Sequence, residues 1–328
     1  MRLLVELSGE HPTLPRAEAL AAMAAERVDV QRIVMGPQIL RLDVVGPFER
    51  AIARLGLAHT VSEEIATGDF DWIRKFARET DLNGRTFRVR ARGLGVDVDV
   101  REVEGALGAD FGCTGRVDLE HPNLDFRLLV ADEFVLGRVM HRVDRSRFET
   151  RKVARRPFSL PISLHPKYAR AVVNLARVPM GGSVLDPFSG TGGILLEAAE
   201  IGLRAVGTDR SPRMVKGARG MLRQFRLDAD VGVADAGCLP IRSATIRGIA
   251  TDPPYGRAAS TEGEPVGHLY ERAFDAFAGL LPPGGHAAVV LPNERAIEIG
   301  AARLRLLETH ALRVHRSLVR HFCVFVKG

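Results

Sequence analysis

Cysteine is scarce in this sequence, and long apolar runs are absent. Cys113, Cys238 and Cys323 are scattered over 328 residues with no CxxC pair. This spacing argues against a disulfide framework and a zinc site, so we expect no metal and a reducing, cytoplasmic location. No apolar run approaches the length of about twenty residues that a membrane span needs. Glu6 interrupts the apolar N-terminus, which therefore predicts no signal peptide.

Aromatic residues are also few, at 6% of the chain, while the formal net charge is +6. A basic chain is compatible with a polyanionic partner, and scarce aromatic residues disfavour extensive base stacking. Arginine gathers on one face of an alternating strand over 86–92 and in a run from 142 to 156. These side chains predict phosphate contacts with a folded RNA, the alternatives being a solvated sheet face and a charged linker. The candidates are Arg88, Arg90 and Arg92 in the strand, and Arg145, Arg151 and Arg155 in the run.

The length of the chain predicts two or three domains. We place a small α+β unit at 1–55, a second unit at 56–145, a linker at 146–160 and a third domain at 161–328. In the first half we expect helices over 16–26, 48–55, 71–79 and 98–109, and strands over 2–7, 33–35, 39–45, 86–92, 126–130 and 134–140. From residue 184 onward strands and helices alternate, which predicts an α/β domain with a parallel sheet covered on both faces.

An aspartate follows each of four strands in that α/β domain. The short apolar segments lead into Asp186, Asp209, Asp235 and Asp252. Because ligands of such sheets bind beyond the carboxyl ends of the strands, these side chains predict a binding site. Each aspartate alone could cap a helix, but four in succession favour a site.

The loop after the first of these strands is Asp186-Pro187-Phe188-Ser189-Gly190-Thr191-Gly192-Gly193. It has neither the Gly-Lys-Ser/Thr of a phosphate-binding loop nor the GxGxxG spacing of a dinucleotide site. An acid at the strand end suits a ligand with a positive amino group, and the glycines let it approach the backbone. Asp209 would then hold ribose hydroxyls and Asp235 would accept from an adenine amino group. An amino-acid-bearing nucleoside fits these demands.

The last of the four strands leads into Thr251-Asp252-Pro253-Pro254-Tyr255-Gly256. The two prolines lack amide donors and have fixed φ, so they end the strand in a stiff turn. Asp252 and a carbonyl of the turn could accept the hydrogens of a planar amine while Tyr255 stacks on its ring. The alternative is an ordinary strand-ending turn, but a carboxylate on a buried strand is costly without a partner.

Together these motifs resemble the S-adenosylmethionine-dependent amino-methyltransferases, and in particular the archaeal tRNA (guanine-10-N2)-methyltransferase family. Residues 160–175 and 315–321 also resemble that family, whereas Ser189 stands where its members often have Cys. The first half resembles a ferredoxin-like domain at 1–55 followed by a THUMP RNA-binding domain at 56–145. For 161–328 the resemblance implies a Rossmann-like domain with a seven-stranded, mostly parallel sheet and an antiparallel C-terminal strand.

The resemblance also implies roles. S-adenosylmethionine would be the cofactor, S-adenosylhomocysteine the product, and tRNA the partner of a monomeric enzyme. Asp252, the carbonyl of Pro253 and the ring of Tyr255 would receive the guanine amine from a base flipped out of its helix. The cofactor would contact His165, Asp186, Phe188, Gly190, Thr191, Gly192, Asp209, Asp235 and Ala236. Whether one methyl group or two are added stays open.

Other substrates and one other class of protein remain possible from the sequence. The Asp252 turn also suits N6-adenine or N4-cytosine methylation of DNA, or guanine methylation elsewhere in tRNA or ribosomal RNA. A non-catalytic RNA-binding protein is the alternative of a different class. Because all four aspartates lie after Pro157, a fragment starting near that residue is expected to fold and bind the cofactor without methylating tRNA.

Overall fold

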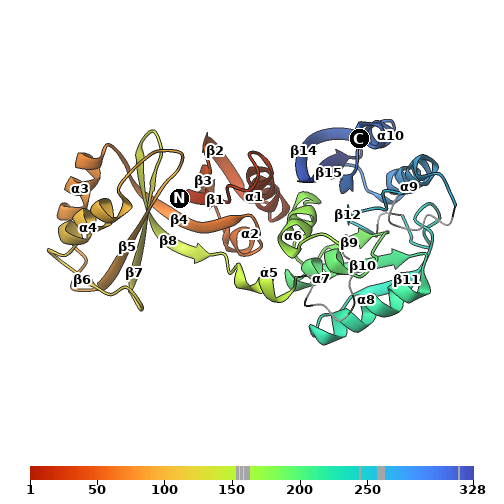
Figure 1. Cartoon of the computed structure of the whole chain (residues 1–328), viewed down its shortest axis with the longest axis horizontal. Helices are drawn as coiled ribbons and strands as arrows, with labels where there is room; N and C mark the ends of the chain where they lie inside the picture. The colour runs from red at the N-terminus through yellow and green to blue at the C-terminus, as the bar shows by residue number, and fades with distance from the viewer. Residues whose placement is uncertain (153–154, 156–157, 159–162, 244, 257–262, 317) are drawn as a thin grey trace. The chain divides into compact units, whose positions relative to one another are not determined.

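The computed structural model describes residues 1–152, 155, 158, 163–243, 245–256, 263–316 and 318–328. The chain forms two compact units, and each is built on one sheet (Figure 1). Unit 1 comprises residues 1–12, 28–47 and 58–143, and unit 2 comprises residues 13–27, 48–57 and 144–328. The finer division into ferredoxin-like, THUMP and linker segments, with boundaries at 55, 145 and 160, stays a prediction.

Unit 1 carries an eight-stranded sheet in the order β2-β3-β1-β4-β8-β7-β5-β6. Its strands are β1 (Arg2–Leu7), β2 (Asp29–Gly36), β3 (Ile39–Val45), β4 (Ala58–Gly68), β5 (Thr86–Gly93), β6 (Arg116–Val117), β7 (Leu124–Val130) and β8 (Phe134–Arg142), with helices α3 (Phe70–Glu79) and α4 (Val100–Phe111). The alternation predicted in β5 is confirmed, because Phe87, Val89 and Ala91 are buried in the core beneath α3 and α4. The arginines of β5 lie on its other face and are partly exposed.

Unit 2 carries a seven-stranded sheet in the order β11-β10-β9-β12-β13-β15-β14. The strands are β9 (Ser183–Asp186), β10 (Arg204–Asp209), β11 (Asp230–Val233), β12 (Gly248–Thr251), β13 (His286–Leu291), β14 (Arg305–His315) and β15 (Leu318–Val326). The first five are parallel, and β15 pairs antiparallel with both β13 and β14. The predicted Rossmann-like sheet with an antiparallel C-terminal strand is confirmed. Its strand order reverses between β9 and β12, where such folds bind ligands.

Helices cover both faces of this sheet. The helices of unit 2 are α1 (Leu14–Ala25), α2 (Glu49–Ala53), α5 (Ser146–Thr150), α6 (Pro166–Leu175), α7 (Gly193–Glu200), α8 (Pro212–Gln224), α9 (Val266–Leu280) and α10 (Glu294–Ala301). One apolar core lies under α6, α7 and α8, and another lies under α9 and α10. Proline in the first turn and a capping side chain begin α6 after His165 and α8 after Ser211. No helix in the described ranges is long and apolar enough to cross a membrane.

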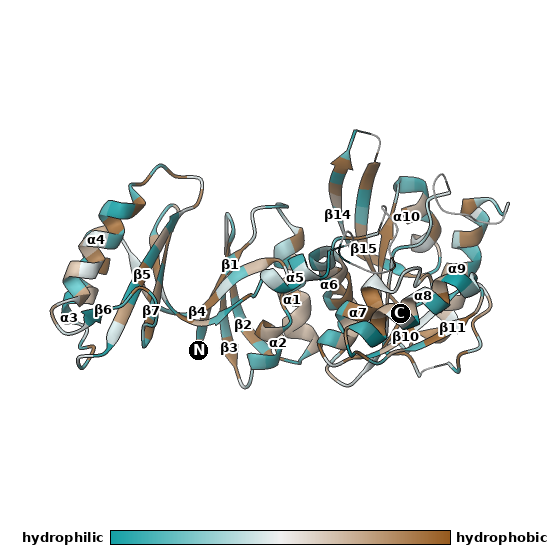
Figure 2. Cartoon of the chain, turned by 60° about the horizontal axis from the view of Figure 1, so that its bottom comes forward, coloured by the Kyte–Doolittle hydropathy of each residue, from teal (hydrophilic) through white to brown (hydrophobic). Residues whose placement is uncertain are grey.

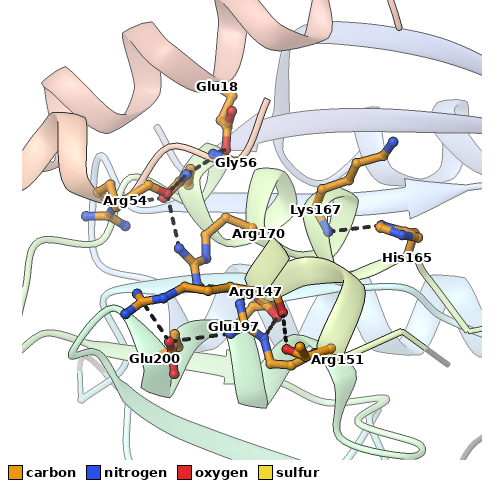
Figure 3. Close-up of polar contacts among 12 residues, drawn as sticks. Glu18, Arg54, Gly56, Arg147, Arg151, His165, Lys167, Arg170, Glu197 and Glu200 are labelled. Atoms are coloured by element: carbon orange, nitrogen blue, oxygen red, sulfur yellow. Dashed lines mark hydrogen bonds and ion pairs between the residues drawn. The ribbon is translucent and has the colours of Figure 1, made fainter. Parts of the chain in front are cut away.

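Two N-terminal helices, α1 and α2, belong to unit 2, and a buried polar network joins them to it (Figure 3). Glu18 of α1 accepts hydrogen bonds from the backbone amides of Gly56 and Leu57 and from Asn174 of α6, each at 2.8 Å. Arg54, which follows α2, donates to the same Asn174 at 2.7 Å. All of these polar groups are fully or almost fully buried, so the hydrogen bonds compensate their loss of water.

A second part of this network lies on α7. Glu197 is 0% exposed and accepts hydrogen bonds from Arg151 at 2.9 and 3.1 Å and from Arg170 of α6 at 2.8 Å. Arg151 follows the short helix α5, which forms within the segment predicted as a linker. The network therefore ties together α5, α6 and α7, the helix that follows the glycine loop, residues 186–193.

Candidate active site

All four predicted aspartates lie at the carboxyl ends of parallel strands, and three of them lie on either side of the point where the strand order reverses. Asp186 ends β9, Asp209 ends β10, and Asp252 follows β12. Asp186 is 2% exposed and accepts a hydrogen bond from the Thr251 hydroxyl at 2.6 Å. Burial, reinforced by the nearby charges of Asp252 and Asp209, raises the pKa of Asp186 to about 7. This carboxyl group is therefore suited to a cationic ligand, whose charge would keep it ionised.

The glycine loop is held by the next strand. The Gly190 amide donates to Asp209 at 2.9 Å, and the other oxygen of Asp209 accepts from the Ser211 amide, also at 2.9 Å. Gly190 and Gly192 have φ of 47° and 81°, values that favour glycine, and Gly192 is the N-cap of α7. A Cβ atom at Gly192 would also approach the Ala218 Cβ to 3.0 Å. The loop conformation therefore depends on glycine at both positions.

The structure places Asp235 differently from the other acids. β11 ends at Val233, one residue earlier than predicted, and Asp235 lies in a turn closed by a bridge to Cys238. Its carboxylate accepts from Arg272 at 2.8 and 3.2 Å and from the Gly237 amide at 2.7 Å. The Arg272 guanidinium holds the pKa of Asp235 below its ordinary value. Ala236, beside it, is buried in the core under α9.

The turn after β12 brings its acid and its ring together. Tyr255 donates its hydroxyl hydrogen to Asp252 at 2.6 Å, and Tyr270 of α9 donates to the Pro254 carbonyl at 2.8 Å. The Asp252 side chain is 17% exposed, so one side of it remains accessible. Burial raises its pKa to about 6, although Arg320 opposes that shift. Asp252 is thus ionised at neutral pH, yet basic enough to hold a proton.

Arg320 is a member of the site that the sequence did not assign. It lies on β15 with its side chain 9% exposed, and a guanidinium nitrogen lies 4.0 Å from an Asp252 carboxylate oxygen. Its charge also acts on Tyr255. The resemblance of 315–321 to the family was the only signal at this position, and nothing local connects Arg320 with a turn 65 residues earlier.

The other predicted cofactor residues lie around the same loop. Phe188 packs partly buried against the core under α9, and Thr191 is buried with its hydroxyl 3.4 Å from that of Ser163. His165 begins α6, and its Nδ1 accepts from the Lys167 amide at 3.4 Å (Figure 3). Pro253 is buried in the turn that carries Asp252. The contacts of all these residues with a cofactor or a base stay predictions.

The predicted RNA-binding arginines fall into three groups. Each arginine of β5 is paired within unit 1: Arg88 with Asp125 at 2.7 Å, Arg90 with Glu104 at 3.4 Å, and Arg92 with Glu6 at 2.9 Å. Arg145 is partly exposed and Arg155 is exposed. Arg151 is 5% exposed and bound to Glu197, so the side chain predicted to contact RNA is instead buried in unit 2. RNA binding by the remaining five stays a prediction.

The residues of the glycine loop fit S-adenosylmethionine. The Ser189 hydroxyl is buried and has no hydrogen-bond partner among the described residues. Beside Gly190, a Cβ atom would meet nothing closer than the Phe188 carbonyl at 3.8 Å, so the backbone is open to a ligand. The buried acid of Asp186 suits the positive amino or sulfonium group of that cofactor. In the described part of the chain, no cluster of three His, Cys, Asp or Glu residues could hold a metal ion.

Comparison with known proteins agrees with this geometry. The family described as "RMKL-like, methyltransferase domain" matches residues 153–321. A tRNA (guanine(10)-N2)-dimethyltransferase of Methanothermobacter thermautotrophicus is 37% identical over 331 residues, which cover 98% of each chain. The protein of that name from Pyrococcus abyssi is 32% identical, again over 98% of both chains.

The chain belongs to the tRNA (guanine(10)-N2)-dimethyltransferase family. This family membership makes it an S-adenosylmethionine-dependent methyltransferase.

Two solved structures share the fold of this family member. TrmN from Thermus thermophilus superimposes with a TM-score of 0.58 at 24% identity, covering 100% of both chains. The putative methyltransferase SMU.472, whose structure is a complex with SAH, has a TM-score of 0.51 at 17% identity and covers 100% of this chain and 98% of its own.

Proposed function

We propose that the enzyme transfers methyl groups from S-adenosylmethionine to the exocyclic N2 amine of guanine 10 in tRNA. The observation that carries the proposal is the Asp252 carboxylate beside the glycine loop. It accepts a hydrogen bond from the Tyr255 hydroxyl and lies 4.0 Å from the Arg320 guanidinium. The two full-length archaeal relatives are named for this modification. A tRNA substrate also supports a cytoplasmic location, and we propose that the enzyme acts as a monomer.

The acceptor amine is a poor nucleophile because its lone pair is delocalised into the purine ring. S-adenosylmethionine supplies the electrophilic methyl group when it is bound. Asp252 and the Pro253 carbonyl would accept the two amine hydrogens, which favours a pyramidal nitrogen with its lone pair directed at the donor. Tyr255 holds the Asp252 carboxylate in place through its hydroxyl. The rate gain would come from positioning and from charge compensation.

The methylated nitrogen must release a proton, and Asp252 is the group placed to accept it. The nitrogen would become cationic as the new N–C bond forms, with S-adenosylhomocysteine as the leaving group, and it must lose one proton to return to neutral. Asp252, with its pKa raised to about 6 by burial, can hold that proton before water removes it.

We propose that two methyl groups are added in succession. The monomethylated amine retains one hydrogen, so the Asp252 carboxylate alone would still orient the lone pair for a second transfer. The names of both full-length relatives as dimethyltransferases support this step.

Position and atom can be tested together with an unmodified tRNA transcript. Nucleoside mass spectrometry after incubation with enzyme and cofactor should detect N2-methylguanosine and then N2,N2-dimethylguanosine. A transcript carrying inosine at position 10 lacks only the N2 amine there and should gain no methyl group. Equal methylation of the inosine transcript would refute guanine 10 as the target, whereas no methylation of either would refute the activity on tRNA.

A further inference from the structure

The strands β14 and β15 extend together past the edge of the sheet at which the parallel strands end, where Asp252 lies. β15 pairs with β13 only from His321 onward, whose partner Leu291 is the last residue of β13. Leu318, Val319 and Arg320 pair with β14 alone. These three residues carry the two strands about 10 Å beyond the end of β13. We call residues 311–316 and 318–320 the β14–β15 arm, and Figure 2 shows the two strands rising to a tip away from the helices of unit 2.

The direction of the extension places the arm at the reaction site. β13 is parallel to β12, so its carboxyl end lies at the edge where β12 delivers Asp252. Arg320, at the root of the arm, lies 4.0 Å from the Asp252 carboxylate. An irregularity between Arg313 and His315 adds one residue to β14 just before the tip. Such bulges bend a strand and redirect its end, and they are frequent next to active sites.

Two of the positive charges of the arm, those of Arg313 and Arg316, are not compensated. No acidic residue follows Glu308 in the sequence. Arg313 and Arg316 are exposed, and no carboxylate in the described part of the chain lies within ion-pair distance of either. The arginines of β5 differ in this respect, because each of them has an acidic partner in unit 1. The guanidinium groups of Arg313 and Arg316 are therefore available for an external anion.

We propose that the β14–β15 arm is a phosphate-binding surface that grips the RNA backbone beside the target nucleotide through Arg313 and Arg316. Arg316 lies in a turn directly after the His315–Leu318 pair, and Leu318 is two strand positions, about 7 Å, from Arg320. It would therefore meet the backbone next to the reacting base and leave the pocket free. Arg313 pairs with Val319 and so lies on the strand face opposite Arg320, which keeps it out of the pocket as well. The planar guanidinium suits bidentate contact with a phosphodiester.

This inference rests on the proposed RNA substrate and adds the element that holds it. The arm and the Asp252 turn are fixed to each other through Arg320, so backbone gripped by the arm is held at a set distance from the acceptor site. The remote parts of a tRNA would then contribute affinity, while the arm would set which nucleotide reaches the pocket.

The test compares the double variant R313A/R316A with the wild-type chain. Filter binding of the tRNA transcript is measured over a range of salt concentrations, without turnover. Losing two phosphate contacts should reduce the slope of log affinity against log salt by about 2, so the advantage of the wild type should shrink about tenfold between roughly 50 and 200 mM salt. Calorimetry should give an unchanged affinity for S-adenosylhomocysteine, and R313K/R316K should restore most of the slope.

The matched control removes the same charge from a region away from the carboxyl ends of the parallel strands. Arg204 begins β10 and Arg223 lies near the end of α8, and both are exposed without an ion pair among the described residues. R204A/R223A should retain the wild-type slope. Equal slopes for both double variants would overturn the arm as a specific surface while leaving the proposed methylation intact. A wild-type chain that neither binds nor methylates the transcript would overturn the proposed function itself.

Discussion

Asp252 must be ionised to accept the amine hydrogens, and its surroundings pull its pKa in opposite directions. Burial raises the pKa to about 6, whereas Arg320 and the Tyr255 hydroxyl lower it. Asp186, itself shifted upward, and Tyr270 also face this region. Because the folded pKa of Asp252 lies above its ordinary value, the reactive carboxylate is present above about pH 6 and is lost as the pH falls through that value.

This balance predicts the effect of Arg320 on the pH profile. Replacing Arg320 with Gln removes the cation and should raise the pKa of Asp252 further. The acid limb of the single-turnover rate should therefore move to higher pH by about one unit. Arg320→Lys keeps the charge and should move the limb much less.

The rates should be measured at saturating cofactor, because Asp186 also titrates near neutral pH and could weaken cofactor binding. If the Gln variant loses activity equally at every pH, the role of Arg320 in ionising Asp252 is wrong and its effect is structural.

Strands and helices were predictable from sequence wherever one local signal dominated. The run Gly248–Thr251 is short and apolar up to its β-branched Thr251, and β12 has those bounds. The helix expected over 16–26 is α1, which begins two residues earlier and carries Pro15 in its first turn. The helix α5 was missed because the run of arginines over 142–156 suggested a linker. The burial of Arg151 depends on Glu197, about fifty positions further along the chain, and no local pattern indicates it.

The network around α7 yields a prediction for stability. Glu197→Gln would leave Arg151 and Arg170 buried with a neutral partner, and breaking a buried ion pair costs about 3–5 kcal/mol. Urea unfolding should show a loss of that size in the free energy of unfolding.

Glu200→Gln is the matched control. Glu200 lies one turn along the same helix, has its side chain 25% exposed, and pairs with Arg151 at 3.4 Å. Its loss should cost about 1 kcal/mol or less. Equal losses for the two variants would show that burial of Glu197 does not set its contribution.

The cofactor domain is not continuous in the chain. The sequence placed all of the chemistry after Pro157, and the family match likewise begins at residue 153. Unit 2, however, includes residues 13–27 and 48–57, and its apolar core contains Leu14, Ala17, Ala21 and Leu57. This long-range packing has no periodicity or motif that marks it in the sequence.

The discontinuity reverses the expectation for a truncated chain. A fragment starting near Pro157 would expose that apolar core and leave Asn174 and Arg170 without Glu18 and the Arg54 carbonyl. Calorimetric melting should show no cooperative transition for the fragment, in contrast to the full-length chain. A cooperative transition together with binding of S-adenosylhomocysteine would show that α1 and α2 are dispensable for the fold of unit 2.

The role of Asp252 is tested most directly by a single-turnover methylation assay of Asp252→Ala with the tRNA transcript. The rate should be at least about 100-fold below that of the wild type, because the acceptor amine loses the group that orients and deprotonates it. Affinities for S-adenosylhomocysteine and tRNA should stay close to those of the wild type. A variant that binds both ligands and keeps a near-normal rate would contradict the assignment of Asp252 as the group that receives the guanine amine.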